Sequence, residues 1–569
     1  MGRDCTGSTA RLLRGTQSNW TKRWTPTWNN AGERWLRRSA CHSTFFHRQM
    51  APPREASSSA PRRLPRVNNQ SSLKISNPNP HDLAPFTNAM KKSLGLIALL
   101  LATTMTSLDL SATAEEPVTL NQKADGYRGI WYMNQPSGDE YVYKYSGGLG
   151  TYCAKHKPFA IYCKEVNKTF FCFGGATAGD SRQLLHMVSY FDHETNTVPR
   201  PTILLDKQTN DAHDNPVISV DDDGHIWIFS TSHGLSRPSY IHRSKRPFDI
   251  NEFELVEATR ADGDNRTPIT NFSYMQMWHS ENGFQAFFTR YNYPAARTIC
   301  FMNSPDGQNW SAWQKLSAIG QGHYQITGIG ASKAGSMFNY HPQGKGLNWR
   351  TNLYYIETAD NGDTWTTVEG KKLTLPLKEV HNEALIHDYE AEGLNVYLKD
   401  LRYDTKNRPV LLYITSKGYE SGPKNDPRTW MLARWTGSEW KRSPITTSDN
   451  NYDMGELWML ADDDWRVIGP TESGPQPYNP GGEVAMWKSV DQGATWTKLR
   501  QMTNGSEMNH TYVRRALDAH PDFIAIWADG HGRKPSHSHL YFSNAAGDVF
   551  QLPRTMEFET AQPKRTEVK

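Results

Sequence analysis

Two pairs of polar residues in the middle of the chain have the side-chain types that move protons and bind negative charge. His213 and His233 are 20 positions apart, and Tyr274 and Arg290 are 16 positions apart. Within each pair, one residue opens a strand-like run, a turn follows, and the other residue closes the next run. Because neighbouring antiparallel strands bring such positions to the same edge of a sheet, we expect all four side chains to reach one face.

These residue types suit acid–base chemistry and the binding of a carboxylate. A neutral histidine or an activated tyrosine can take or return a proton near neutral pH. An arginine stays charged and can hold a carboxylate through two parallel hydrogen bonds. Each residue also has a simpler interpretation: a histidine that bonds its own turn, a tyrosine in the core, or an arginine paired with a nearby carboxylate.

The spacing of histidines and cysteines predicts no cofactor. The histidines form neither an HExxH pattern nor a pair four positions apart, and no CxxC or Cys/His zinc spacing occurs, although a structural metal ion stays open. Two of the six cysteines, Cys5 and Cys41, lie near the N-terminus. An exported protein could pair some of the remaining four, and the sequence leaves the pairing open; they are Cys153, Cys163, Cys172 and Cys300.

The elements that carry these residues are predicted to be short strands. Beyond residue 115 the chain is a series of aromatic or alternating apolar runs, such as 225–234 (HIWIFSTSHG) and 284–292 (FQAFFTRYN). Gly, Asp, Asn and Pro separate the runs, and no apolar period of 3.6 residues is sustained. The fold class is therefore expected to be all-β.

Three turns repeat one pattern, at 304–310 (SPDGQNW), 358–365 (TADNGDTW) and 489–496 (SVDQGATW). They resemble the Asp-box, or BNR repeat, whose Asp accepts turn N–H groups, whose Gly supplies a positive φ and whose Trp packs under the hairpin. Such repeats mark the blades of β-propellers and imply a structural role. At about 50–65 residues per blade, the region holds about seven blades, with six or eight as alternatives.

Residues 90–114 have the features of a secretory signal peptide. Lys91 and Lys92 form the basic start, residues 94–102 the apolar stretch, and residues 112–114 (ATA) a small-residue cleavage site. We therefore expect Met90 to be the true start, 1–89 to be a disordered, non-native extension, and 115–569 to be a single propeller domain. The alternative is a membrane anchor, but the apolar stretch is shorter than the roughly 20 residues that a spanning helix needs.

The charge distribution supports this division. Residues 1–89 contain 14 Lys and Arg against 4 Asp and Glu, a net charge of +10. Residues 115–569 contain 47 against 54, a net charge of −7. An acidic mature region argues against nucleic acid as a partner. The signal peptide predicts a secreted or periplasmic protein with no stable membrane span after cleavage.

The order of the polar residues resembles that of BNR-repeat polysaccharide lyases, especially the seven-bladed ulvan lyases. By that likeness, His213 and Tyr274 take the acid and base positions and Arg290 neutralises the uronate. His233 and His341, the latter in the segment 339–342 (NYHP), take supporting, substrate-binding positions. The resemblance implies β-elimination on a uronate-containing, sulfated or unsulfated glycan, in which a base removes the C5 proton and an acid protonates the departing oxygen.

Two other functions stay open at this point. Asp-boxes are equally typical of sialidase-like glycoside hydrolases, but those enzymes carry an Arg-Ile-Pro segment where this chain has 128–131 (RGIW). A non-catalytic carbohydrate-binding propeller would use the same residues to hold sugar. The sequence does not identify the glycan or the oligomeric state.

Overall fold

The computed structural model describes residues 118–567, and within this range almost all regular structure is β-strand. The helices of this range are two three-residue 3-10 turns, η1 (Ala212–Asp214) and η2 (Pro423–Asn425). No helix in the described part is long and apolar enough to cross a membrane. The predicted all-β class is confirmed, because short aromatic and β-branched runs between turn residues fold as strands.

Five four-stranded antiparallel sheets follow one another along the chain. They consist of β9 (Pro216–Val220), β10 (Ile226–Ser230), β11 (Tyr240–Ser244) and β12 (Phe253–Leu255); β15 (Ser273–Ser280), β16 (Gly283–Tyr291), β17 (Arg297–Ser304) and β19 (Gln314–Ser317); β20 (Gln325–Ile329), β21 (Ala334–Tyr340), β22 (Thr351–Thr358) and β23 (Leu385–His387); β24 (Asn395–Tyr403), β25 (Pro409–Ser416), β26 (Arg428–Trp435) and β27 (Trp440–Ser448); and β28 (Glu456–Ala461), β29 (Asp464–Glu472), β30 (Glu483–Ser489) and β31 (Thr497–Gln501).

A ten-stranded sheet joins the two ends of the described chain. Its strands, in spatial order, are β1 (Gln122–Lys123), β8 (Thr202–Asp206), β6 (Leu185–Asp192), β5 (Lys168–Gly175), β4 (Ala160–Cys163), β32 (Asn509–His520), β33 (Phe523–Gly530), β34 (Leu540–Ser543), β35 (Val549–Gln551) and β37 (Lys564–Arg565). The two halves of this sheet meet where β4 and β32 pair in parallel, with Leu517 opposite Ile161.

The smaller sheets lie in the connections. They are the hairpin of β2 (Trp131–Pro136) and β3 (Tyr143–Gly148), the sheet of β13 (Thr259–Asp262), β14 (Asn265–Pro268) and β18 (Asn309–Trp310), and the pair of β7 (Val198–Pro199) and β36 (Thr560–Ala561).

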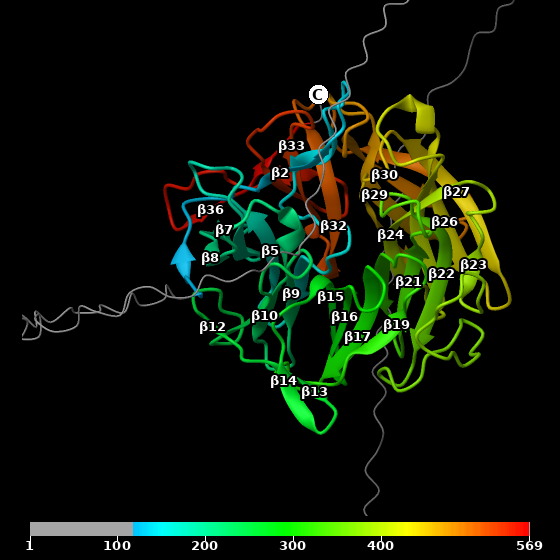
Figure 1. Cartoon of the computed structure of the whole chain (residues 1–569). Coiled ribbons are helices and arrows are strands. Elements are labelled where there is room, and N and C mark those ends of the chain that lie inside the picture. Colours follow the sequence, from blue (N-terminus) through cyan, green and yellow to red (C-terminus); the bar gives the residue numbers. More distant parts are fainter. Residues whose placement is uncertain (1–117, 568–569) are drawn as a thin grey trace, which may run out of the picture. The chain divides into compact units, whose positions relative to one another are not determined.

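The first strands of successive sheets form a closed ring. Each of β4, β9, β15, β20, β24, β28 and β32 contacts the next, and β32 contacts β4. Figure 1 shows the sheets following one another in chain order around a common centre. This arrangement confirms a propeller-like fold, and it brings the ends of the ring strands together near the middle.

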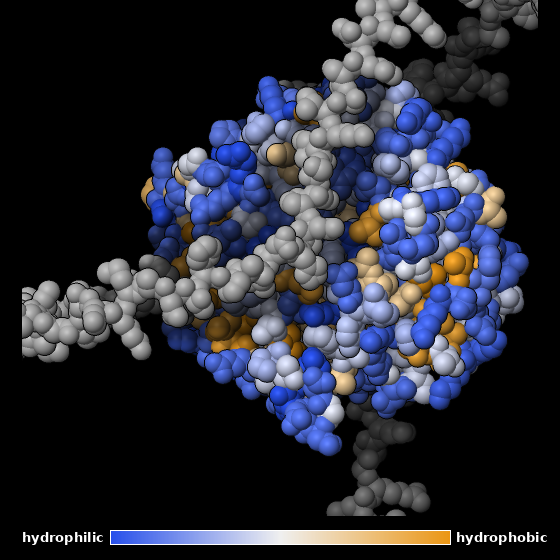
Figure 2. Space-filling model, viewed as in Figure 1, coloured by the Kyte–Doolittle hydropathy of each residue, from blue (hydrophilic) through white to orange (hydrophobic). Residues whose placement is uncertain are grey.

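Aromatic side chains fill the spaces between neighbouring sheets. Phe229, Phe284 and Trp310 lie with their ring centroids 6.1 to 6.3 Å apart, between the sheet that begins with β9 and the one that begins with β15. Burial of one such side chain contributes roughly 1.5–3 kcal/mol. On the outside, the face visible in Figure 2 is mainly hydrophilic, with apolar residues in separate patches. The space between these two sheets thus has its own small core.

The three turns with the repeated pattern connect the third and fourth strands of their sheets. In the last of them, Oδ1 of Asp491 accepts the backbone N–H of Thr495 at 2.9 Å, and Gly493 has φ +83°. Trp496 donates its indole N–H to the carbonyl of Gly493 at 3.2 Å. These bonds stay within the turn, so they organise the hairpin.

Replacement of Asp491 by Ala should therefore destabilise the fold without altering chemistry. Loss of the turn hydrogen bonds is expected to cost about 1–2 kcal/mol of unfolding free energy. Thermal unfolding measures this cost, and turnover per folded molecule should be unchanged. A fully folded variant with reduced turnover would contradict a structural role for the turn.

Some sequence predictions concern residues outside the described range. The basic extension 1–89, the signal peptide 90–114, and Cys5 and Cys41 all lie there. Within the described range, the four cysteines left open for pairing are buried and free; they are Cys153, Cys163, Cys172 and Cys300.

Candidate active site

Asp211 links the two histidines of the first predicted pair. It precedes η1, and its side chain accepts the backbone N–H of His213 at 3.0 Å. One carboxylate oxygen lies 2.5 Å from Nδ1 of His213, and the other lies 2.7 Å from Nδ1 of His233. The two rings stack with their centroids 3.9 Å apart and their planes at 16°. A single carboxylate therefore fixes the orientation of both imidazoles.

Burial and the carboxylate together determine the protonation of His213. Burial lowers the pKa of His213, and Asp211 opposes this effect only in part. Burial would raise the pKa of Asp211, but the two imidazoles beside it lower this pKa below its usual range. We therefore assign an ionised Asp211 that accepts Nδ1–H of a neutral His213. The lone pair on Nε2 then faces the hydroxyls of Tyr145 and Tyr152, at 3.1 and 2.9 Å.

Tyr274 faces the same histidines. Its ring centroid lies 6.1 Å from that of His213 and 6.4 Å from that of His233, and its hydroxyl accepts a hydrogen bond from Tyr291 at 3.0 Å. Tyr274 has φ +51° at a register irregularity of β15. A bulky residue with this backbone conformation costs about 1–3 kcal/mol and is typical of functional sites. Burial keeps Tyr274 protonated, because it raises the pKa of the hydroxyl.

Two arginines that the sequence analysis did not single out complete this group. The guanidinium of Arg297 lies over the rings of Tyr291 and Tyr324, at 5.4 and 4.9 Å. Arg350 lies over Tyr324 at 4.3 Å and donates to the hydroxyl of Tyr452 at 2.8 Å. We call His213, His233, Tyr274, Arg297 and Arg350 the central cluster.

The two arginines of the central cluster are buried and only partly hydrogen-bonded. Arg297 and Arg350 are only 8% and 6% exposed, and Nη1 of Arg297 and Nε of Arg350 have no hydrogen-bond partner in the described structure. Among residues 118–567, neither arginine forms an ion pair with a carboxylate, and the groups that most raise the pKa of each are tyrosines. Burial, followed by the charges of Arg350 and Arg297, lowers the pKa of nearby Lys144 to about 6. An anionic ligand would balance this charge.

His341 adjoins the arginines. Its Nδ1–H donates to the carbonyl of Trp349 at 2.9 Å, and its ring lies 5.3 Å from that of Tyr324. Nε2 is buried and has no hydrogen-bond partner among residues 118–567. Burial and the charges of Arg297 and Arg350 lower the pKa of His341, so the imidazole is neutral near pH 7.

The guanidinium of Arg290 is already hydrogen-bonded to another residue, Asn271. Its Nη1 donates to the backbone carbonyl and the side-chain oxygen of Asn271, at 2.7 and 3.0 Å, and its guanidinium lies over Trp313 at 4.4 Å. Asn271 in turn donates to the carbonyls of Gly234 and Arg237, in the loop that follows β10. Of the predicted residues, the structure thus brings His213, His233 and Tyr274 into mutual contact, with His341 beyond Tyr324 and Arg290 bound to Asn271.

The residues that sequence reasoning missed carried only weak signals. Lys144 and Tyr145 lie in a segment rich in tyrosine and glycine, 143–152 (YKYSGGLGTY). Tyr324 lies in the segment 322–325 (GHYQ). Arg297 is the first residue of β17, and Arg350 immediately precedes β22. Each therefore lies where a loop leads into a strand. No motif distinguishes these two arginines from others in the chain.

The histidines also offer donors for a metal ion. Asp211, His213 and His233 place one possible ligand atom each within 4.8 Å of one another. The same atoms already form the carboxylate–imidazole contacts described above. Proton transfer needs only those contacts, so we derive no step from a metal here.

Comparison with known proteins agrees with this description. A family model of BNR repeat-containing proteins matches residues 183–448. We call residues 183–448 the BNR region. The BNR region includes every residue of the central cluster, together with Asp211, Arg290 and His341, whereas Lys144, Tyr145 and Tyr152 precede it.

The chain that carries this BNR region is similar to two ulvan lyases. The first, "Ulvan Lyase-PL25" from Pseudoalteromonas sp. (strain PLSV), is 24% identical over 367 residues, which cover 56% of this chain and 69% of the relative. The second, from Alteromonas sp. (strain LOR), is 22% identical over 359 residues, with the same shares covered.

A solved ulvan lyase of the polysaccharide lyase family PL25 has a related fold. It superposes with a TM-score of 0.56 at 17% identity and covers 75% of this chain and 96% of its own. The same enzyme was also solved bound to -[GlcA(1-4)Rha3S]-, with the same TM-score and coverage. At this identity the likeness shows the fold.

Proposed function

We propose that this protein is a secreted polysaccharide lyase that cleaves uronate-containing glycans by β-elimination. The observation that carries the proposal is the pair of buried arginines, which have no carboxylate partner in the described range and lie beside a neutral histidine and a protonated tyrosine. Such a site suits a substrate that brings its own carboxylate. The similarity to ulvan lyases supports this reaction, and the sulfated ligand of the solved relative supports sulfated uronate glycans as candidates.

In the proposed mechanism, Arg297 and Arg350 hold the uronate carboxylate and stabilise the charge that develops on it. Nε2 of His213 removes the C5 proton, because this nitrogen carries the lone pair when Nδ1–H donates to Asp211. The electrons of the C5–H bond form the C4=C5 double bond, and the C4–O4 bond breaks. Tyr274 donates its proton to the departing oxygen, since burial keeps its hydroxyl protonated at neutral pH.

His233 and Arg290 have supporting roles in this proposal. His233 stacks on His213 and shares Asp211 with it, so it helps to hold the base in place. Arg290 fixes Asn271, whose amide bonds the loop after β10. We therefore assign the carboxylate to Arg297 and Arg350 instead of Arg290, and we retain His341 as a substrate-binding residue beside them.

We also infer that the propeller has seven blades. The ring of seven first strands supports this number, with two blades joined into the ten-stranded sheet by the β4–β32 pair. A mature chain that begins near residue 115 and a single domain over 115–569 belong to the same proposal. The turns at Asp306, Asp360 and Asp491 would then be Asp-boxes of three blades.

Incubation with a panel of uronate polysaccharides tests the proposed reaction. A lyase should produce the ultraviolet absorbance of a C4=C5 double bond conjugated with the carboxylate, together with new reducing ends. A glycoside hydrolase would produce reducing ends without that absorbance, and a carbohydrate-binding propeller would produce neither. Reducing ends without absorbance on every cleaved uronate glycan would refute the lyase assignment.

A further inference from the structure

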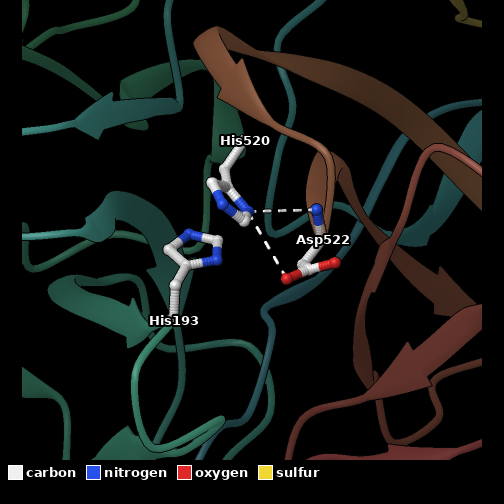
Figure 3. Close-up of side chains that lie close together, drawn as sticks. All are labelled: His193, His520 and Asp522. Carbon is white, nitrogen blue, oxygen red and sulfur yellow. Dashed lines mark hydrogen bonds and ion pairs between the residues drawn. The ribbon is translucent and has the colours of Figure 1, made fainter. Parts of the chain in front are cut away.

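A second group of imidazole and carboxylate side chains lies apart from the central cluster. His193 follows β6, His520 ends β32, and Asp522 lies in the turn between β32 and β33. One ligand atom from each lies within 4.8 Å of the others, and the two imidazole centroids are 4.0 Å apart. Figure 3 shows the three side chains turned toward one another from two separate parts of the chain.

His193 has a buried nitrogen with no partner. Its side chain is 8% exposed, and Nδ1 makes no hydrogen bond to any residue that the structure describes. The other nitrogen, Nε2, lies 2.8 Å from Oγ1 of Thr169. A proton on Nε2 donated to Thr169 leaves the lone pair on Nδ1, the nitrogen next to the side chain's first carbon, which faces the other two residues in Figure 3. A buried polar atom without a partner is costly, so this lone pair suits an additional ligand.

His520 and Asp522 form the accessible side of the group. Their side chains are 27% and 56% exposed, and Asp522 Oδ2 lies 3.5 Å from Nδ1 of His520. The backbone N–H of Asp522 donates to the same nitrogen at 3.2 Å. A solvated ion can therefore reach the group from the Asp522 side. The ring centroid of Tyr162 lies 5.3 Å from that of His193 and 5.1 Å from that of His520. An aromatic ring therefore packs against both imidazoles.

We propose that His193, His520 and Asp522 bind a divalent transition-metal ion of the zinc type. Two imidazoles and one carboxylate are ligands that this class of ion prefers, and water would complete a tetrahedral set. Metal–ligand distances of 2.0–2.2 Å would require ligand atoms about 3.3 Å apart, so the three side chains would close inward slightly.

The position of the group gives the metal a structural role. His193 follows β6, in the half of the ten-stranded sheet that comes from the start of the described chain, whereas His520 and Asp522 belong to the half from its end. Strands β4 and β32 pair only through Leu517 and Ile161, and β7 and β36 form another short pair between the two ends of the described chain. A metal held by both halves would therefore reinforce the point at which the ring closes.

Equilibrium dialysis of the chelator-treated full-length protein against zinc, with metal quantification, tests the proposal. The wild type should bind zinc at this site, and its melting temperature should rise with zinc concentration. His193→Ala and the exposed Asp522→Asn should each lower the affinity of this site at least about tenfold and abolish most of the rise. Asp522→Asn keeps the test valid if the buried substitution does not fold.

Two control variants separate this site from others. His387→Ala removes a histidine that lies 2.5 Å from Glu392 in another sheet and should leave zinc binding unchanged. His233→Ala disrupts the other candidate group found in the described range, Asp211, His213 and His233, and should also leave the proposed site occupied. Unchanged zinc affinity in Asp522→Asn, loss of zinc binding in His233→Ala, or no zinc binding by the wild type would each contradict the proposal.

Discussion

Tyr274→Phe should lower kcat by roughly 10²–10⁴-fold on the best uronate substrate. The substitution retains the ring that packs against His213 and His233 and removes only the hydroxyl that we assign as the proton donor. The carboxylate contacts of Arg297 and Arg350 do not depend on that hydroxyl, so KM should change little. Steady-state kinetics followed by the absorbance of the unsaturated product measures both parameters.

Tyr413→Phe provides a matched control. Tyr413 is a buried tyrosine whose hydroxyl lies 2.7 Å from that of Tyr389, much as that of Tyr274 lies 3.0 Å from Tyr291. Each variant loses one buried hydrogen bond between two tyrosine hydroxyls, so both should have a melting temperature that is lower by a similar amount. Only Tyr274→Phe should lose turnover. Full activity of Tyr274→Phe would make it a packing residue and would require another proton donor.

Arg297→Lys and Arg350→Lys should each reduce kcat/KM on uronate glycans by roughly 10²–10³-fold. Lysine keeps the charge but lacks the planar group that stacks on Tyr324 and holds a carboxylate at two points. Binding of a neutral glycan should change far less, because it has no carboxylate to neutralise. Parallel kinetics on uronate substrates and affinity measurements on a neutral glycan give the comparison.

Arg290→Lys distinguishes the two possible assignments of the carboxylate. Because Arg290 is bound to Asn271, its replacement should cost less than replacement of Arg297. A larger loss in Arg290→Lys than in both other variants would return the carboxylate to Arg290, as the resemblance to ulvan lyases implies.

Features that depend on neighbouring residues could be predicted from the sequence alone. The strands, the three repeated turns and the pairing of His213 with His233 are of this kind. β9 and β10 pair with Pro216 opposite Ser230, so the residues just outside that pair lie together at one end of the hairpin. The local hydrogen-bonding capacity of Asp211 then brings both rings onto one carboxylate.

The second predicted pair shows where local reasoning fails. Ser273 lies opposite Thr289, which would place Tyr274 near Arg290, but the register shifts between Ser273 and Gln276. Adjacent residues of a strand point to opposite faces, so Tyr291 and not Arg290 meets the hydroxyl of Tyr274. An irregularity of this kind depends on packing against neighbouring strands, which no spacing in the sequence records.

The binding side of the candidate site was decided only by the tertiary structure. Arg297 and Arg350 come from different sheets, and Tyr324, which lies between them, precedes β20. The closed ring of first strands brings these positions together, and no carboxylate among the described residues pairs with either arginine. The sequence by itself determined which groups could transfer protons, because this depends on side-chain type and local bonding. Which arginines lie beside these proton-transferring groups depends on contacts between residues far apart in the chain. Only the closure of the ring creates those contacts.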